Sequence, residues 1–285
     1  MRKDILIPFF YVVLAPLLGG LLAGVDRRIT ARLQGRFGPP ILQPFYDVAK
    51  LFCKENLVAH RTQTAYIVFF LVFMVFTGGI FYAGEDLLLV IFSMMLANTF
   101  FVLAGYKGGA PYSSIGAERE LLQIMAYEPM ILFYAMGIYM ASKTFYVEQI
   151  AVTQHPMLIV SLPGVFLGFL YVLTIKLRKS PFDLSTSHHG HQEIVKGITT
   201  EFTGPALGLI EIAHWYENIL LLGLVGLFFA PNLWLGALAA LLVYFLEIFI
   251  DNACARARWQ LTVFSSWVVA AVLGFGNILA ITLFR

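Results

Sequence analysis

Long apolar runs constrain this chain of 285 residues more than any other feature. Each run is long enough to cross a bilayer as a helix, which satisfies its own backbone hydrogen bonds without water. Only 13% of the residues are charged, about half the usual share in soluble domains. The sequence therefore predicts an all-α integral membrane protein, with one polytopic domain over residues 1–285 and about eight transmembrane helices. The predicted runs are 5–25, 65–83, 87–106, 124–141, 157–175, 205–229, 231–250 and 261–283.

The basic residues lie mostly on one side of these runs. Of the 19 Lys and Arg residues, all but Arg2, Lys3, Lys143 and Arg285 fall in the odd-numbered connections. Basic residues are retained on the cytoplasmic side of a membrane. We therefore expect a multi-pass protein of the cell inner membrane, with both termini outside and the odd-numbered connections in the cytoplasm. These connections cover residues 26–64, 107–123, 176–204 and 251–260.

The cysteines give no sign of a redox centre within the chain. Cys53 and Cys254 are isolated, and no CxxC motif is present, which argues against an iron–sulfur, haem or zinc site. The sequence also has no phosphate-binding Walker loop and no GxGxxG motif. We expect the chain to bind no cofactor, metal or nucleic acid and to have no catalytic residue, so any electron carrier belongs to a partner.

The first connection combines four arginines with an amphipathic segment. Residues 41–55, ILQPFYDVAKLFCKE, repeat apolar side chains at helical spacing and predict a helix along the membrane surface. Basic residues beside such a helix favour anchoring to lipid headgroups, docking of a cytoplasmic subunit, or both. The four arginines are Arg27, Arg28, Arg32 and Arg36.

The second connection, YKGGAPYSSIGAERELLQIMAYEP, contains ionisable residues of two kinds. Glu118, Arg119 and Glu120 follow a turn rich in glycine, where a local ion pair or a coupling contact would explain them. Glu128 lies beyond apolar residues and directly before Pro129, which frees a backbone carbonyl and can kink a helix. An acid at that depth indicates a functional site, and a structural hydrogen bond to a neighbouring helix is the alternative.

The third connection holds a cluster of histidines within SPFDLSTSHHGHQEIVKG. These histidines could bind a metal, contact a partner or relay protons, since imidazole titrates near neutral pH. Further ligands at a recognisable spacing are missing, which argues against the metal. The candidate partner-docking and coupling residues here are Pro181, Phe182, Asp183, His188, His189 and His191.

Three ionisable residues recur along the sixth apolar run. Glu211, His214 and Glu217 are spaced three apart, so they form one stripe on a helix. A charge at mid-membrane costs at least about 2.5–3.5 kcal/mol, so such residues face a protein interior or a water path. Glu201 precedes them near the membrane surface. Carboxylates in apolar surroundings can exchange protons near neutral pH, which makes these residues candidates for a proton path.

Three segments together resemble the eight-helix membrane subunit at the heel of respiratory complex I, which also occurs in related NiFe hydrogenases. They are residues 26–55, 105–129 ending in AYEP, and 180–202 from SPFDL to EIVKGITTEF. The forms GGAPYSSIGAERELL and STSHHGHQEIVKG resemble the energy-converting, ferredoxin-linked group 4 hydrogenases. The resemblance implies a membrane-anchor and coupling subunit that links ferredoxin-dependent proton reduction to H2 with H+ or Na+ translocation.

The resemblance also implies site residues and partners. Glu128, Glu193 and Glu201 match acids of the family's proton path, whereas His214 stands where complex I has a glutamate. The implied partners are the hydrogenase large and small subunits, which would hold the nickel–iron centre and iron–sulfur clusters, a ferredoxin-like subunit and an antiporter-like membrane subunit. The alternatives are the heel subunit of a quinone-reducing, complex I-like oxidoreductase and a self-standing transporter. The lack of repeated halves argues against the transporter.

Overall fold

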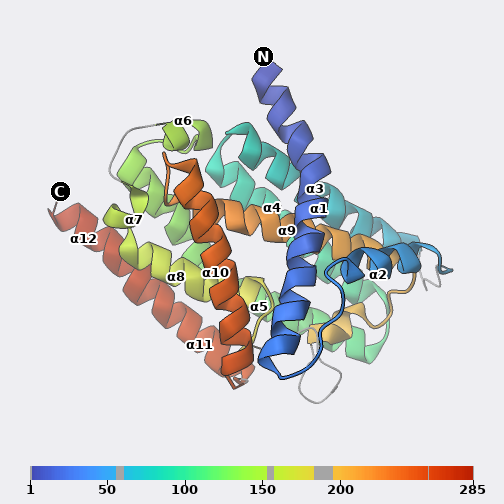
Figure 1. The fold of residues 1–285 in the computed structure, drawn as a ribbon. Helices are drawn as coiled ribbons and strands as arrows, with labels where there is room; N and C mark the ends of the chain where they lie inside the picture. Colours follow the sequence, from blue (N-terminus) through green and yellow to red (C-terminus); the bar gives the residue numbers. More distant parts are fainter. Residues whose placement is uncertain (1, 56–60, 153–156, 183–194, 256, 285) are drawn as a thin grey trace.

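The computed structural model describes residues 2–55, 61–152, 157–182, 195–255 and 257–284 (Figure 1). In these ranges seven helical segments are long and apolar enough to cross a membrane, which confirms the predicted all-α membrane fold. They are α1 (Arg2–Leu33), α3 (Arg61–Ala83), α4 (Leu87–Lys107), α5 (Pro111–Ser142), α9 (Pro205–Leu227), α10 (Leu233–Ala253) and the continuous segment α11 (Trp259–Val269), η2 (Ala270–Phe275) and α12 (Gly276–Phe284). The shorter elements are α2 (Gln43–Phe52), α6 (Val147–Val152), α7 (Leu158–Ser161), α8 (Pro163–Lys176) and η1 (Val195–Thr199).

The odd-numbered connections meet at one end of the bundle. In Figure 1, α1 descends from the N-terminus at the top to its arginine-bearing end at the bottom. Helices α4, α8 and α10 also end on that side, and α3, α5, α9 and α11 begin there, because successive long helices alternate in direction. We call this side the connection end.

The fifth apolar run, residues 157–175, forms a broken helix. The chain makes the short α7, leaves helical geometry at Leu162 and restarts as α8 at Pro163. Proline lacks an N–H donor and fits best in the first turn of a helix. The 14 residues of α8 extend about 21 Å, which is short of the ~30 Å hydrocarbon core. Lys176, at the end of α8, is consequently buried inside the protein.

Helix α5 begins earlier than the predicted run at 124–141. It starts at Pro111, again in the first turn, and continues through Pro129 to Ser142. Glu118, Arg119 and Glu120 therefore lie in the early turns of α5, before its apolar part. The helical geometry points these three side chains in different directions.

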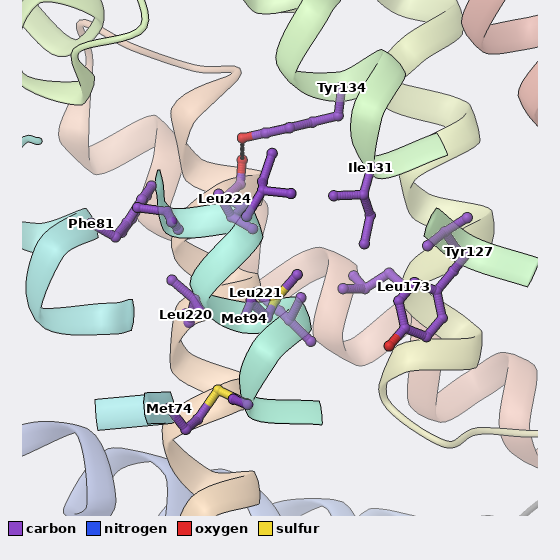
Figure 2. Packing of buried hydrophobic residues seen from close by; sticks show 14 of the residues in the cluster. Met74, Phe81, Met94, Tyr127, Ile131, Tyr134, Leu173, Leu220, Leu221 and Leu224 are labelled. Atoms are coloured by element: carbon purple, nitrogen blue, oxygen red, sulfur yellow. Dashed lines mark hydrogen bonds between the residues drawn. The ribbon is translucent and has the colours of Figure 1, made fainter. Parts of the chain in front are cut away.

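A large apolar core fixes α5 and α9 relative to each other. Helix α9 packs against α1, α3 and α10, while α5 packs against α4, α8 and α11. Figure 2 shows the Tyr134 hydroxyl of α5 donating a hydrogen bond to the Leu224 carbonyl of α9, over 3.0 Å. The side chains of Met94 and Leu221 are fully buried in the same core and lie below this contact in Figure 2. This packing sets where the ionisable residues of α5 and α9 lie.

Glycines allow the end of the third connection to lie directly on α5. A Cβ atom on Gly116 would overlap the amide nitrogen of Ile198 in η1. A Cβ atom on Gly197 would lie 2.5 Å from the carbonyl oxygen of Tyr112. Backbone therefore meets backbone here, and only residues without a side chain permit it.

Replacing Gly116 by alanine is expected to displace η1 from α5 and destabilise the protein. An overpacked contact costs about 1–3 kcal/mol, and the clashing atom is backbone, which cannot rotate away. The thermal midpoint of the purified protein in detergent measures the effect. The matched control is Gly79→Ala on α3, where a Cβ atom would meet nothing within 4 Å. An equal response in both variants would contradict the packing argument.

Candidate functional site

A buried set of charged side chains joins α5, α8, α9 and the start of the third connection. The Lys176 ammonium donates to Glu217 Oε1 over 2.6 Å, and both side chains are 4% exposed. The Arg178 guanidinium donates to Glu120 Oε1 over 2.9 Å. Glu217 lies near the middle of α9, so these ion pairs sit at depth within the bundle. We call Glu120, Lys176, Arg178, His214 and Glu217 the central network.

His214 connects the two ion pairs of the central network. Its Nε2 atom lies 2.5 Å from Arg178 Nη1, and its Nδ1 atom lies 3.2 Å from Glu217 Oε2. A guanidinium only donates hydrogen bonds, so Nε2 must accept and Nδ1 must carry the proton that Glu217 accepts. His214 is therefore a neutral imidazole in this arrangement. The rings of Phe70 and Phe101 pack against it and hold its orientation.

Arg178 ties the central network to the third connection. Its backbone is in the left-handed region, with φ of 55°, and its guanidinium also lies 5.2 Å from the centre of the Phe101 ring. Burial opposes its charge, but the carboxylates of Glu120 and Glu217 outweigh this effect and raise the pKa of Arg178 above its ordinary value. The charge is permanent, so a displacement of the third connection would move a positive charge past Glu120 and His214.

The geometry sets what the central network can do chemically. Arginine does not release its proton in proteins, so Arg178 cannot pass a proton from Glu120 to His214. It can change the electrostatic potential at His214 and Glu217 instead. Lys176 adds a second fixed charge, which also lies 4.6 Å from the centre of the Tyr127 ring. The network is therefore suited to transmitting a movement as a change of charge around Glu217.

Changing Arg178 to lysine is expected to lower the stability of the protein. A lysine ammonium is a point donor, and it cannot bond Glu120 and His214 together as the planar guanidinium does. Losing a hydrogen bond to a charged group costs about 1.5–3 kcal/mol. The measurement is the unfolding free energy of the purified protein, with Arg28→Lys at an exposed position of α1 as the control. Equal stability of the two variants would show that a lysine ammonium can replace the guanidinium of Arg178 without cost.

Glu201 lies at a second place, beside the end of α4. Its Oε2 atom is buried and has no hydrogen-bond partner among the described residues, and the same holds for both side-chain polar atoms of Gln63. A Cβ atom on Gly108 would overlap Glu201 Oε2, so the glycine makes room for the carboxylate. Glu201 thus packs against the end of α4.

The structure separates the other candidates for a proton path. Glu211 is half-buried and joins no ion pair with another described residue, whereas His214 and Glu217 of the same stripe are bonded. Glu128 is half-buried before Pro129 and experiences the charge of Lys176. Of the predicted proton-path residues, the structure thus brings together His214 and Glu217. It places Glu201 elsewhere, beside Gly108 and Gln63.

The predicted coupling residues are likewise distributed over several contacts. Arg119 stacks on the Trp259 ring, 4.7 Å from its centre, and Glu118 is exposed, so the local ion pair expected of them does not form. The Pro181 carbonyl accepts a hydrogen bond from the Ala257 amide over 2.5 Å. The Phe182 ring is buried against Tyr171. Asp183, His188, His189, His191 and Glu193 lie outside the described residues.

The four arginines of the first connection are exposed at the connection end: Arg27, Arg28, Arg32 and Arg36. Arg27 donates to Asp47 of α2 over 2.6 Å. Partial burial opposes the ionisation of Asp47, but the hydrogen bonds from Arg27 and Gln43 lower the pKa of this carboxyl.

On its other face α2 packs against α9, with the Phe45 and Trp215 rings 5.2 Å apart. Residues 43–52 thus form the helix that the sequence predicts, and this helix lies against the bundle. The docking role of the arginines stays a prediction.

The sequence analysis did not identify Lys176 and Arg178 as site residues. One signal could have identified them. Pro163 and Lys176 are too close in sequence for the helix between them to cross the bilayer, so the basic residues at its end had to lie within the protein.

Comparison with known proteins gives consistent matches. The family model described as NADH dehydrogenase matches residues 5–282. Hydrogenase-4 component C of Escherichia coli (strain K12) is 25% identical and covers 90% of this chain and 89% of its own. NADH-ubiquinone oxidoreductase chain 1 of Mytilus edulis is 28% identical, over 93% and 91%. A chain of the membrane-bound sulfane sulfur reductase, an archaeal respiratory membrane complex, has the same fold, with a TM-score of 0.84, 22% identity and coverage of 96% and 99%.

Proposed function

The chain belongs to the NADH dehydrogenase family, and from this membership we propose that it anchors and couples an energy-converting NiFe hydrogenase. At the coarser level it is a multi-pass membrane subunit of a hydrogenase or complex I-like complex, with partner subunits. The finer proposal is supported by the second and third connections, whose sequence forms resemble those of the ferredoxin-linked hydrogenases.

In the proposed complex the redox chemistry takes place on partners. A small subunit would hold iron–sulfur clusters and a large subunit the nickel–iron centre, which would allow two electrons from reduced ferredoxin to reduce two protons to H2. These subunits would dock on the connection end, where Arg27, Arg28, Arg32 and Arg36 are exposed. With that end in the cytoplasm, both termini lie outside and the chain resides in the inner membrane.

The observation that carries the coupling role is the bonding of Arg178 to both Glu120 and His214. A redox event beside the third connection would shift Arg178 and so change the field at His214 and Glu217. Glu201 and Glu193, on the same connection, would take up or release protons in response. An antiporter-like neighbour would then move H+ or Na+ outward. One ion moved against 100 mV requires about 2.3 kcal/mol, which the redox step must supply.

The second candidate is the heel subunit of a quinone-reducing oxidoreductase. It is favoured by the relative named NADH-ubiquinone oxidoreductase chain 1, which matches this chain about as well as the hydrogenase component does. Both functions use the same fold and both place electron carriers on partners.

Purification of the intact complex distinguishes the two functions. We expect the preparation to contain nickel and to evolve H2 when supplied with reduced ferredoxin. Metal analysis and gas measurement check this result, with quinone reduction assayed on the same preparation. Quinone reduction by a complex without nickel would contradict the hydrogenase proposal and favour the second candidate.

A further inference from the structure

A second buried cluster links the third connection to α1 and α10. The Lys179 ammonium bonds Asp26 of α1 and lies 3.4 Å from Asp251 of α10. The Ser180 amide donates to the same Asp251 carboxylate over 2.9 Å. We call Asp26, Lys179, Glu247 and Asp251 the lysine-179 cluster. It shares no residue with the central network, and nothing in the proposed coupling uses it.

Glu247 is the unsatisfied member of the lysine-179 cluster. It lies one helical turn before Asp251 on α10 and is 1% exposed. Its Oε2 atom has no hydrogen-bond partner among the described residues. Residues four apart on a helix share a face, so Glu247 lies on the side of α10 that carries Asp251, and the charges of Lys179 and Asp251 both act on it.

The charges of the lysine-179 cluster do not balance if every member is ionised. Three carboxylates would share one ammonium, and Glu247 is the most deeply buried of the three. Among the described residues of α1 and α10, Tyr244, Thr30 and Asn252 also interact with the cluster or with its immediate neighbours, and they are uncharged. A buried carboxylate without a partner takes up a proton instead of remaining charged. Asp26 and Asp251 already hold the ammonium, so the proton falls to Glu247.

We propose that Glu247 is a proton-binding site, and that Lys179 links its protonation to the attachment of the third connection. With Glu247 neutral, Lys179 stays bonded to Asp26 and Asp251. Loss of the proton creates a third carboxylate that competes for the same ammonium and draws it away from Asp26. The attachment of the third connection to α1 is therefore strong while Glu247 alone is protonated and weaker once Glu247 ionises. This inference does not depend on which reaction the complex catalyses.

Infrared spectroscopy of the purified complex tests the proton site directly. At neutral pH the wild type should show a protonated-carboxyl band that moves in deuterated water and is missing from Glu247→Gln. The control is Glu85→Gln, an exposed acid at the opposite end of the bundle, which should keep the band. Identical spectra of the wild type and Glu247→Gln would overturn the assignment. Assembly of Glu247→Asp but not of Glu247→Gln would also overturn it, because a charge would then be required.

Hydrogen exchange tests the link through Lys179. After correction for intrinsic exchange, amides of residues 177–182 should lose protection as the pH rises in the wild type. Glu247→Gln cannot ionise, so protection of this segment should stay constant with pH. A parallel loss of protection in both proteins would show that Lys179 does not respond to Glu247.

Discussion

Replacing Glu217 by alanine is expected to destabilise the protein by about 3–5 kcal/mol, the cost of breaking a buried ion pair from one side. The Lys176 ammonium would remain buried without its carboxylate, and the Nδ1 proton of His214 would lose its acceptor. The yield of assembled protein and its unfolding free energy measure the loss. Glu118→Ala on α5 is the control, because that carboxylate is exposed.

The double variant Lys176→Met with Glu217→Leu distinguishes the effect of an unpaired buried charge from the effect of lost side-chain packing. Replacing both members of a buried ion pair by apolar residues of similar size is often neutral or stabilising. We therefore expect the double variant to recover most of the stability that Glu217→Ala loses. A double variant as unstable as the single one would show that the ion pair itself, and not the unpaired lysine, supports the fold.

Changing Glu201 to glutamine is expected to abolish ion uptake while dye-linked H2 evolution continues. The amide has the shape of a protonated carboxyl group, so it fits beside Gly108 and Gln63, but it cannot release a proton. In the proposed complex the dye-linked reaction takes place on the partner subunits and does not need ion movement. The measurement is ion uptake by inverted membrane vesicles, together with the dye-linked rate in the same preparation.

Glu85→Gln provides the comparison for Glu201→Gln, because Glu85 is an exposed acid remote from the connection end. It should leave both activities unchanged. Unimpaired ion uptake in Glu201→Gln would remove Glu201 from the proton path. Loss of both activities together would instead point to a failure of assembly, which the amount of partner subunits in the membrane would reveal.

The membrane helices could be predicted from sequence because hydropathy is a local property. In lipid a backbone must bond to itself, so a long apolar run has few conformations open to it. The exceptions also have local causes. Pro163 ends α7 and starts α8 within one predicted run, and Pro111 starts α5 well before its apolar part.

The candidate site could be predicted only where its members are close in sequence. His214 and Glu217 are three residues apart on one helix, and they are bonded as that spacing suggests. Glu217 and Lys176 are 41 residues apart, so their pairing depends on how α8 and α9 pack. Asp251 shows the same limit. The structure pairs it with Lys179 of the third connection, 72 residues away.

The central claim is that buried charges of this chain couple a partner's redox reaction to ion movement. The most direct test is the ratio of ions taken up to H2 evolved by the reconstituted complex carrying Lys176→Met with Glu217→Leu. We expect this complex to assemble and evolve H2 at the wild-type rate while the ratio falls to the background of leaky vesicles. A ratio equal to that of the wild type would contradict the claim.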